Sequence, residues 1–291
     1  MTAVLPAPPP ESSFQTEFAF TPRDFQTIAD LLRRRAGISL PPGKAALVYS
    51  RLAKRVRGLG LASFAEYCVL LTGEGGAAEA QVMLRALTTN VTRFIREPHH
   101  FEDLRRLVAE AAPGLRAGGR LRLWSAGCST GQEPYSMAFA VLSELPDAGA
   151  LDVRILASDI DTDVLETGRA AVYSDEDLEA VPAHLRPHWF DACAGRDGWR
   201  VSEAARSLVA FREMNLNAVD WPMKGPFQAV FCRNVAIYFD EDSQNRLWRR
   251  FATLMQPDAC LYVGHSERVR DPAFSACGLT AYRRTTEEAR P

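Results

Sequence analysis

Short apolar runs alternate with amphipathic segments from residue 120 onward, and this alternation constrains the fold more than any other feature of the sequence. Buried strands are predicted at 121–125, 153–158, 227–232 and 260–263. Amphipathic helices are predicted at 132–145, from 161 or 162 onward, and at 242–255. Apolar strands separated by helices are typical of a parallel sheet with crossover helices. We therefore expect an α/β domain whose ligand site lies at the carboxyl ends of the strands of a doubly wound sheet.

Residues 172–213 interrupt this alternation. Ser174 and Asp177 form a capping box, and short apolar runs follow at 199–201 and 208–211. We interpret this stretch as a small helix and a hairpin inserted into the sheet domain.

The first hundred residues predict a different architecture. Thr21, Pro22 and Asp24 form a helix start, and Gly37 is the expected stop. Further helices are predicted at 43–57, from Ser63 onward and at 77–87, and no strand is predicted before residue 120. This part of the chain is expected to be a small helical domain.

Length and composition fit a globular protein of about two domains. The chain has 291 residues, of which 47% are apolar and 24% charged. Residues 1–17 are proline-rich and are predicted to form a flexible tail without a signal-peptide pattern, so a cytoplasmic location is expected. The six cysteines are far apart and form no C-x-x-C pair, which predicts reduced thiols and no zinc site.

Charge is distributed unevenly along the chain. Residues 1–100 hold 12 Lys and Arg against 8 Asp and Glu, a balance of +4, whereas the remainder holds 22 against 28, a balance of -6. Eight basic residues and no acidic residue occur between Leu31 and Ala65. The helical part is therefore predicted to meet an acidic partner.

The turn at 124–134, after the first predicted strand, is a candidate binding segment. Its small residues let a ligand approach the backbone, but it is not G-x-G-x-x-G and lacks the lysine of a phosphate-binding loop. Glu133 would repel a pyrophosphate and can accept a hydrogen bond from an ammonium group. An amino acid conjugate is therefore a better candidate ligand than a dinucleotide. An ordinary tight strand-to-helix turn is the alternative.

Asp159 ends the second predicted strand, about 25 residues after that turn. A carboxylate at this place commonly binds ribose hydroxyls, and we expect that role for Asp159. The neighbouring Asp161 is expected to cap the following helix.

Residues 231–239 follow the third predicted strand and carry polar side chains toward the same edge of the sheet. Arg233, Asn234 and Tyr238 are the candidates for ligand contact. A strand end followed by simple packing residues is the alternative.

Residues 89–101 join the two predicted domains. They include His99 and His100 at the expected start of a helix. Adjacent histidines on a helix do not easily face one metal ion, so a solvated or capping role is predicted for them.

Four segments together closely resemble one protein family. They read T-N-V-T-R-F-I-R-E-P-H-H-F, S-A-G-C-S-T-G-Q-E-P-Y-S, A-S-D-I-D and F-C-R-N-V-A-I-Y-F, in this order. The chain is thereby similar to the chemotaxis receptor methyltransferases of the CheR type, which use S-adenosylmethionine (SAM) to esterify glutamate side chains of chemoreceptors. The resemblance spans residues 21–285.

The resemblance implies a fold in two parts. A small all-α domain at 18–88 and a linker at 89–99 precede a Rossmann-like SAM-dependent methyltransferase domain at 100–291. This domain is implied to bear an inserted small antiparallel β-subdomain at 172–213. The hydrophobic pattern predicts the same α/β architecture.

The resemblance also implies a set of cofactor contacts. Glu133 faces the amino group of the methionine part, Asp159 faces the ribose, and Asn215 and Leu216 flank the adenine. The implied cofactor-binding residues are Asn90, Thr92, Arg96, Glu133, Asp159, Asn215, Leu216, Arg233 and Asn234.

Arg96 and Tyr238 are implied to lie closest to the transferred methyl group and to be catalytic. Gln132, Ala236 and Ile95 depart from the residues that many relatives have at these positions. All three are compatible with cofactor binding, and Ile95 can reshape the methyl pocket.

The implied partner is the helical cytoplasmic domain of a chemoreceptor. The basic residues predicted to bind it are Lys44, Arg51, Lys54 and Arg55, and a merely solvated helix face is the alternative. Dependence on a receptor C-terminal peptide is not expected, because the loop 194–198 is shorter than in relatives that bind one. Nucleic acid is not an expected partner, because the pI is near 6.2 and 232–235 lacks the signature of amino-directed nucleic acid methylases. Membrane insertion is not expected either, because the N-terminal stretch has no apolar run long enough for a membrane span.

The chemistry needs no general base. A glutamate side chain has a pKa of about 4.3 and is already anionic at pH 7, so it is itself the nucleophile. The expected products are a glutamate methyl ester and S-adenosylhomocysteine (SAH), with no metal involved. The alternatives are a non-catalytic SAM-binding sensor or adaptor, and a SAM methyltransferase that acts on another substrate.

Overall fold

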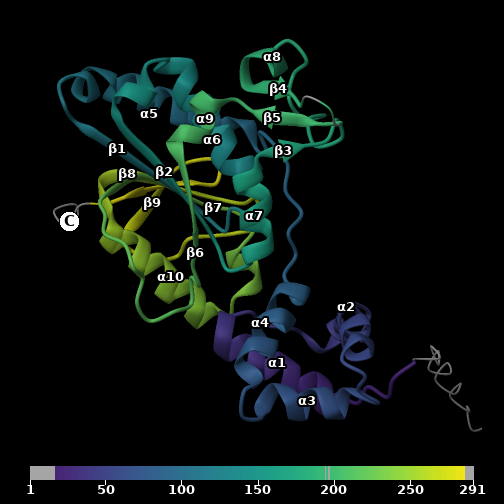
Figure 1. The fold of residues 1–291 in the computed structure, drawn as a ribbon. Coiled ribbons are helices and arrows are strands. Elements are labelled where there is room, and N and C mark those ends of the chain that lie inside the picture. The colour runs from purple at the N-terminus through teal and green to yellow at the C-terminus, as the bar shows by residue number, and fades with distance from the viewer. Residues whose placement is uncertain (1–16, 194, 196, 286–291) are drawn as a thin grey trace, which may run out of the picture. The chain divides into compact units, whose positions relative to one another are not determined.

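The computed structural model describes residues 17–193, 195 and 197–285, and these form two units (Figure 1). The first unit contains the residues up to Leu31 together with Pro41–Leu87. The second contains Leu32–Leu40 and the chain from Thr88 onward. Leu32–Leu40 thus groups with the second unit, although it was predicted to belong to the helical domain. Of the predicted tail 1–17, the structure describes Glu17 alone, whose carboxylate pairs with Arg57.

The first unit is helical, as predicted. Its elements are α1 (Pro22–Ala36, shared with the second unit), η1 (Pro42–Lys44), α2 (Ala45–Gly58), α3 (Phe64–Thr72) and α4 (Gly76–Leu87). The predicted capping box is present, because the Thr21 N–H donates to the Asp24 carboxylate at 2.9 Å and the Asp24 N–H donates to Thr21 Oγ1 at 3.2 Å. Ser63 Oγ likewise accepts from the N–H of Glu66 at 3.3 Å.

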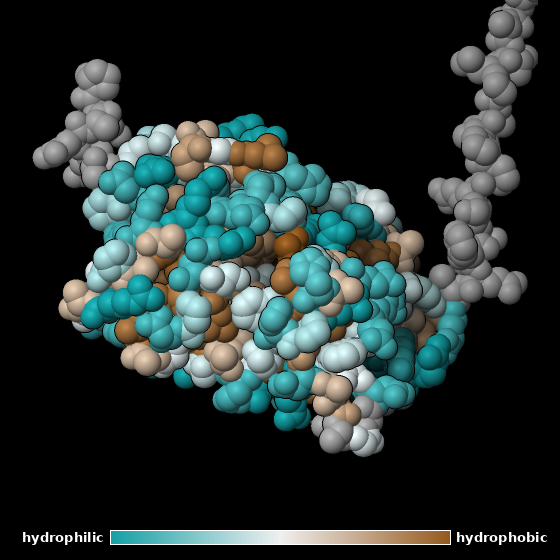
Figure 2. Space-filling view, turned by 90° about the horizontal axis from the view of Figure 1, so that it is seen from above, coloured by the Kyte–Doolittle hydropathy of each residue, from teal (hydrophilic) through white to brown (hydrophobic). Residues whose placement is uncertain are grey.

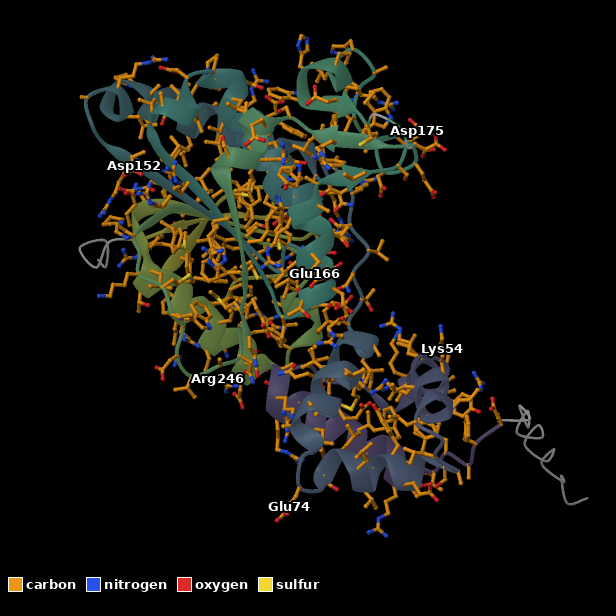
Figure 3. All side chains as sticks on the ribbon, in the orientation of Figure 1. Lys54, Glu74, Asp152, Glu166, Asp175 and Arg246 are labelled. Carbon is orange, nitrogen blue, oxygen red and sulfur yellow. The ribbon has the colours of Figure 1, made fainter. Side chains whose placement is uncertain are left out.

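Helix α2 owes its position to an apolar stripe. Val48, Leu52 and Val56 recur every four residues, so they share one face, and all three are fully buried. Lys54 lies on the exposed part of the same helix (Figure 3). One face of α2 therefore holds the helical unit together while basic side chains remain at its surface.

The second unit is built on a mixed sheet. Within the described residues the strand order is β6-β2-β1-β7-β8-β10-β9, with β6, β2, β1, β7 and β8 parallel and β10 antiparallel to both of its neighbours. The strands are β1 (Arg120–Ala126), β2 (Asp152–Asp159), β6 (Val209–Glu213), β7 (Phe227–Cys232), β8 (Met255–Val263), β9 (Phe274–Gly278) and β10 (Ala281–Arg284).

Helices cover both faces of this sheet (Figure 1). Leu121 and Leu123 of β1 belong to the core that includes α5 and α6, whereas Trp124 and Ala126 belong to the core that includes α10. The helices of this unit are α5 (Pro98–Arg116), α6 (Gln132–Glu144), η2 (Ala148–Ala150), α7 (Thr162–Ala170), α8 (Arg186–Trp189), α9 (Glu203–Leu208), η3 (Ala236–Tyr238) and α10 (Glu241–Leu254). The predicted doubly wound α/β fold is confirmed.

The inserted subdomain is smaller than predicted. A three-stranded antiparallel sheet contains β3 (Val172–Tyr173), β5 (Trp199–Val201) and β4 (Phe190–Ala192), in that order. Of the run 208–211, predicted to complete this hairpin, Leu208 ends α9 and the rest belongs to β6, which pairs in parallel with β2 in the main sheet. That prediction was wrong because a short apolar run has the same pattern in a hairpin and at the edge of a parallel sheet.

The surface is mixed in character. Hydrophilic side chains predominate on the face shown in Figure 2, with hydrophobic ones in small scattered groups. In the described part of the chain, no helix combines the length and the apolar character that a membrane span requires.

Candidate active site

The turn after β1 brings the backbone of β1 and β2 together. The N–H groups of Gly127 and Cys128 donate to the carbonyl of Ser158 at 2.8 and 2.9 Å. Gly127 has φ +87°, and a Cβ there would lie 2.3 Å from a methyl carbon of Val235. Glycine is therefore required on both conformational and steric grounds, and it lets the turn pack against the loop that follows β7.

Asp159 lies at the carboxyl end of β2, as predicted. One of its oxygens accepts the N–H of Ser129 at 2.8 Å and the other accepts the N–H of Asp161 at 3.0 Å. Burial raises the pKa of Asp159, and the two hydrogen bonds partly offset this effect. Since each carboxylate oxygen can accept more than one hydrogen bond, the group keeps capacity for ligand hydroxyls.

Glu133 is at the start of α6 and is buried. Its carboxylate accepts from the Ser125 hydroxyl at 2.7 Å and from Arg233 at 3.0 Å. Burial raises the pKa of Glu133, although the charge of Arg233 opposes the rise. The predicted ligand for an ammonium group is thus a carboxylate that already carries one cationic partner.

Arg233 ties three segments of the site together. Its guanidinium also lies 3.3 Å from Glu97, donates to the carbonyl of Arg96 and stacks over the Phe101 ring at 5.7 Å. Its side chain is only 2% exposed, so its positive charge is balanced by the carboxylates of Glu97 and Glu133 and not by solvent. Burial raises the pKa of Glu97, but the charge of Arg233 and contacts with neighbouring histidines outweigh it, and the net shift is downward.

Glu97 was missed by the sequence reasoning. In the sequence only its position next to Arg96 pointed to it, because the unusual backbone geometry of this stretch, with φ +52° at Ile95 and +56° at Glu97, is seen only in the structure. Residues other than glycine rarely adopt this left-handed conformation, and a β-branched residue such as isoleucine adopts it least readily. In this conformation the carbonyl of Arg96 and the carboxylate of Glu97 both reach the guanidinium of Arg233.

The linker is fixed by Asp161. Its carboxylate accepts from the Asn90 side-chain amide at 2.8 Å and from the Thr88 hydroxyl at 3.3 Å, and it also caps α7 at the N–H of Asp163. The carbonyl of Asn90 accepts from the Ser129 hydroxyl at 2.7 Å. The helix-cap prediction for Asp161 is confirmed, and the cap also holds the Asn90 side chain, while the Ser129 hydroxyl joins the Asn90 main chain to the turn after β1.

The remaining predicted site residues differ in how they are engaged. The Asn215 amide donates to the carbonyl of Arg35 at 2.5 Å and its oxygen accepts from Asn217, so its polar atoms already have partners. Leu216 is buried in the core that includes α10. Thr92 is partly exposed.

Arg96, Asn234 and Tyr238 stand apart because their side chains keep donor or acceptor capacity. Arg96 reaches the carbonyl of Val91 at 3.4 Å. The Asn234 side-chain oxygen is buried and has no hydrogen-bond partner among the described residues. Tyr238 is partly exposed, and its carbonyl accepts from the N–H of Ser39 at 2.7 Å.

The four basic residues of the helical unit separate into two pairs. Arg55 makes a two-pronged contact with Glu79 at 2.8 and 2.5 Å, and Arg51 donates to the carbonyl of Leu87 at 2.8 Å. Lys44 and Lys54 are exposed. Arg51 and Arg55 are partly exposed and also make these contacts inside the helical unit, so receptor binding by all four residues stays a prediction.

The predicted solvated role is wrong for His100, which is fully buried, and His99 and His100 lie side by side. Their Nε2 atoms lie 3.2 and 3.3 Å from the carbonyl of Leu279, and metal-ligating atoms of Glu97, His99 and His100 all lie within 4.8 Å of one another. Burial lowers the pKa of His100 to about 3, so its ring is neutral at neutral pH. Glu97 already has a cationic partner in Arg233. That no metal binds here stays a prediction.

Comparison with known proteins defines the class to which this geometry belongs. The model of the CheR methyltransferase SAM-binding domain matches residues 90–283, and that of the CheR methyltransferase all-alpha domain matches residues 23–88. The chain belongs to the CheR methyltransferase family.

Curated relatives match over nearly their whole length. The chain is 48% identical to a probable chemotaxis protein methyltransferase of Rhizobium etli, covering 87% of this chain and 96% of the relative. It is 46% identical to chemotaxis protein methyltransferase 2 of Pseudomonas aeruginosa, covering 90% and 93%. It is 40% identical to the chemotaxis protein methyltransferase of Escherichia coli, covering 91% of each.

Proposed function

We propose that this protein transfers the methyl group of SAM to glutamate side chains in the cytoplasmic helical domain of methyl-accepting chemotaxis receptors. The products are glutamate methyl esters and SAH. The observation that carries the proposal is a pair of acids, Glu133 at the start of α6 and Asp159 at the end of β2, in a chain of the CheR methyltransferase family.

The residues at this edge of the sheet suit SAM. Glu133 offers a buried carboxylate to the ammonium group, and Asp159 offers acceptors to the ribose hydroxyls. The buried oxygen of Asn234 is a further acceptor. Asn90, Thr92, Arg96, Leu216 and Arg233 complete the proposed pocket, with the main chain around Asn215 beside the adenine.

SAM supplies an electrophilic methyl group on a positively charged sulfur. The acceptor carboxylate is anionic at neutral pH, so no residue of this chain has to remove a proton. Charge is lost as the carboxylate oxygen approaches the methyl carbon, and water would stabilise the separated ions. The protein therefore contributes mainly by alignment and by exclusion of water.

Arg96 and Tyr238 are proposed to act at the methyl group. A guanidinium bound tightly to the acceptor would stabilise the ground state more than the discharged transition state. We therefore assign Arg96 to holding the cofactor and shaping the approach path. The Tyr238 hydroxyl is assigned to steering the acceptor oxygen.

Receptor binding is assigned to the exposed lysines of the helical unit. Lys44 and Lys54 complement an acidic helical surface without loss of an internal contact. Binding of a receptor C-terminal peptide is not part of the proposal, and Ala194 and Arg196 of the corresponding loop lie outside the described residues. The proposed location is the cytoplasm.

The test is the lability of the product. The protein and radiolabelled SAM are incubated with membranes carrying its chemoreceptor, and the label is then treated with mild alkali. Carboxyl methyl esters release methanol under these conditions, whereas N-methyl products keep the label. Binding of SAM without label transfer would instead favour a sensor or adaptor.

A further inference from the structure

The loop that follows β7 is held by a side chain from a distant part of the chain. Glu267 is 3% exposed, and its carboxylate accepts backbone N–H groups from two segments. Among the described residues these donors are Asn234 at 2.8 Å, Val235 at 2.9 Å, Ala236 at 2.7 Å, Ile237 at 3.3 Å and Gly264 at 2.6 Å.

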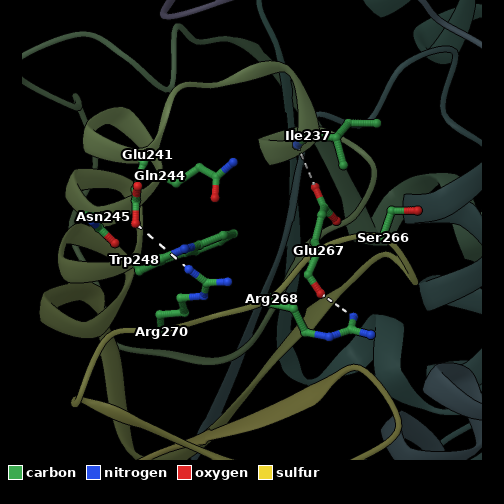
Figure 4. Close-up of a pocket in the computed structure, with 9 residues that line it drawn as sticks. All are labelled: Ile237, Glu241, Gln244, Asn245, Trp248, Ser266, Glu267, Arg268 and Arg270. Atoms are coloured by element: carbon green, nitrogen blue, oxygen red, sulfur yellow. Dashed lines mark hydrogen bonds and ion pairs between the residues drawn. The ribbon is translucent and has the colours of Figure 1, made fainter.

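The same loop is held from its other side by Gln244. This residue lies in the first turn of α10, and its side-chain amide donates to the carbonyls of Ala236 and Phe239 at 2.9 and 3.1 Å. Glu267 therefore takes the loop's N–H groups while Gln244 supplies hydrogen bonds to its carbonyls. Figure 4 shows the two side chains on opposite sides of a cavity next to Ile237.

The arrangement exceeds what a short helical turn requires. A local Ser or Asp commonly caps such a turn, whereas here a carboxylate about thirty residues away is buried to do so. Burying a carboxylate is costly unless most of its acceptor sites are filled. A buried carboxylate that accepts several N–H groups of one loop fixes the position of that loop as well as stabilising it.

The position that is fixed belongs to two proposed site residues. Asn234 begins the clamped stretch with φ +58°, and a Cβ on Gly264 would lie 2.8 to 2.9 Å from Asn234 atoms. Tyr238 ends the stretch, between the carbonyls of Ala236 and Phe239 that Gln244 binds. Movement of the loop would shift both side chains relative to Arg233.

We propose that Glu267 and Gln244 form a clamp that positions Asn234 and Tyr238 for methyl transfer. Both are positioning residues that act through the loop and do not touch the reacting atoms. This inference rests on the methyl transfer proposed above. Because the reaction depends on alignment, a small displacement of Tyr238 should slow transfer more than it weakens cofactor binding.

The first test replaces Glu267 by its isostere in Glu267→Gln. The amide nitrogen cannot accept the N–H groups that one carboxylate oxygen holds. We expect kcat to fall about tenfold or more, with KM for SAM changed less than about threefold. Amide hydrogen exchange at 234–237 should accelerate while exchange in β1 and β2 stays unchanged. Glu241→Gln is the matched control, because Glu241 lines the same cavity and its carboxylate pairs with Arg270, 3.9 Å away, and not with the loop.

The second test avoids the buried acid. Gln244→Glu removes the donor with little change of volume at a partly exposed position, so the fold should survive. It should also lower kcat more than it raises KM for SAM. The inference is overturned if either variant keeps wild-type kcat, or if KM for SAM and kcat change in proportion. Absence of transfer by the wild-type protein would contradict the proposed function instead, and hydrogen exchange would still report on the clamp.

Discussion

The two units of the molecule each bury a glutamate against an arginine, but with opposite effects on the carboxyl group. In the helical unit, Arg55 binds Glu79 through two nitrogens and Tyr67 adds a hydroxyl at 2.9 Å, so the pKa of Glu79 is lowered. In the sheet unit, Arg233 is shared between carboxylates, and burial raises the pKa of Glu133. A fully satisfied pair stabilises a fold, whereas an under-satisfied buried acid retains affinity for a further cation.

The largest expected effect is on cofactor affinity in Glu133→Gln. We expect the affinity for SAH to fall about 100-fold, because a charge-assisted hydrogen bond to a buried carboxylate contributes about 1.5–3 kcal/mol. Calorimetric titration with SAH measures the change. Glu79→Gln makes the same chemical change in the other unit and should leave SAH affinity unaltered. Equal affinities of Glu133→Gln and wild type would remove the distinction between the two pairs.

The second largest effect is expected on the free energy of unfolding of the Glu79→Gln variant. Loss of the carboxylate leaves Arg55 and Tyr67 with a weaker acceptor, so the free energy of unfolding should fall by about 2 kcal/mol. Denaturant unfolding measures it, and Glu74→Gln at an exposed site of the same unit (Figure 3) is the control, expected to stay within about 0.5 kcal/mol of wild type.

The lowered pKa of Glu79 makes the free energy of unfolding depend on pH. The contribution of Glu79 is present above the ordinary carboxyl pKa of 4.5 and is lost as pH falls through the lower folded value. Wild type and Glu79→Gln should therefore converge in acid. A constant difference down to the lowest pH at which both fold would contradict the assignment.

A smaller effect is the pH dependence of SAH binding. The ligand's ammonium group requires ionised Glu133, whose pKa is raised above 4.5 by burial. Affinity should therefore weaken as pH falls while the pH is still above 4.5, by at most about tenfold per pH unit for this one group. Titrations across this range should show a flatter profile in Glu133→Gln. A wild-type profile that stays level down to pH 4.5 would be incompatible with the raised pKa.

The smallest effect separates the exposed Lys54 from Arg55, which is paired with Glu79. Lys54→Glu should raise KM for the receptor by about threefold, because one exposed charge contributes little, and should leave SAH affinity unchanged. Arg55→Glu should instead destabilise the helical unit, since it faces Glu79. A rise in KM for Arg55→Glu at unchanged stability would show that its charge also meets the receptor.

Much of the site could be predicted because its residues stand at the ends of recognisable strands. Asp159 follows an apolar run, Glu133 opens an amphipathic helix, and Asp161 has the local spacing of a cap. Each of these features depends only on residues that are close together in the sequence. The positions of the three acids could therefore be predicted from the local hydrophobic and capping patterns.

What could not be predicted depends on contacts between distant residues. Glu267 meets a loop about thirty residues away, and Arg55 meets Glu79 across two helices, so no local pattern signals either contact. Strand β6 was assigned to the wrong sheet for the same reason. Its pairing with β2 depends on topology that a five-residue run does not encode.

The most direct test of the account is a crystal structure of the protein with SAH. We expect the amino group of SAH to lie within hydrogen-bond distance of Glu133 and its ribose hydroxyls to reach Asp159. SAH bound elsewhere, or bound with neither acid in contact, would contradict it.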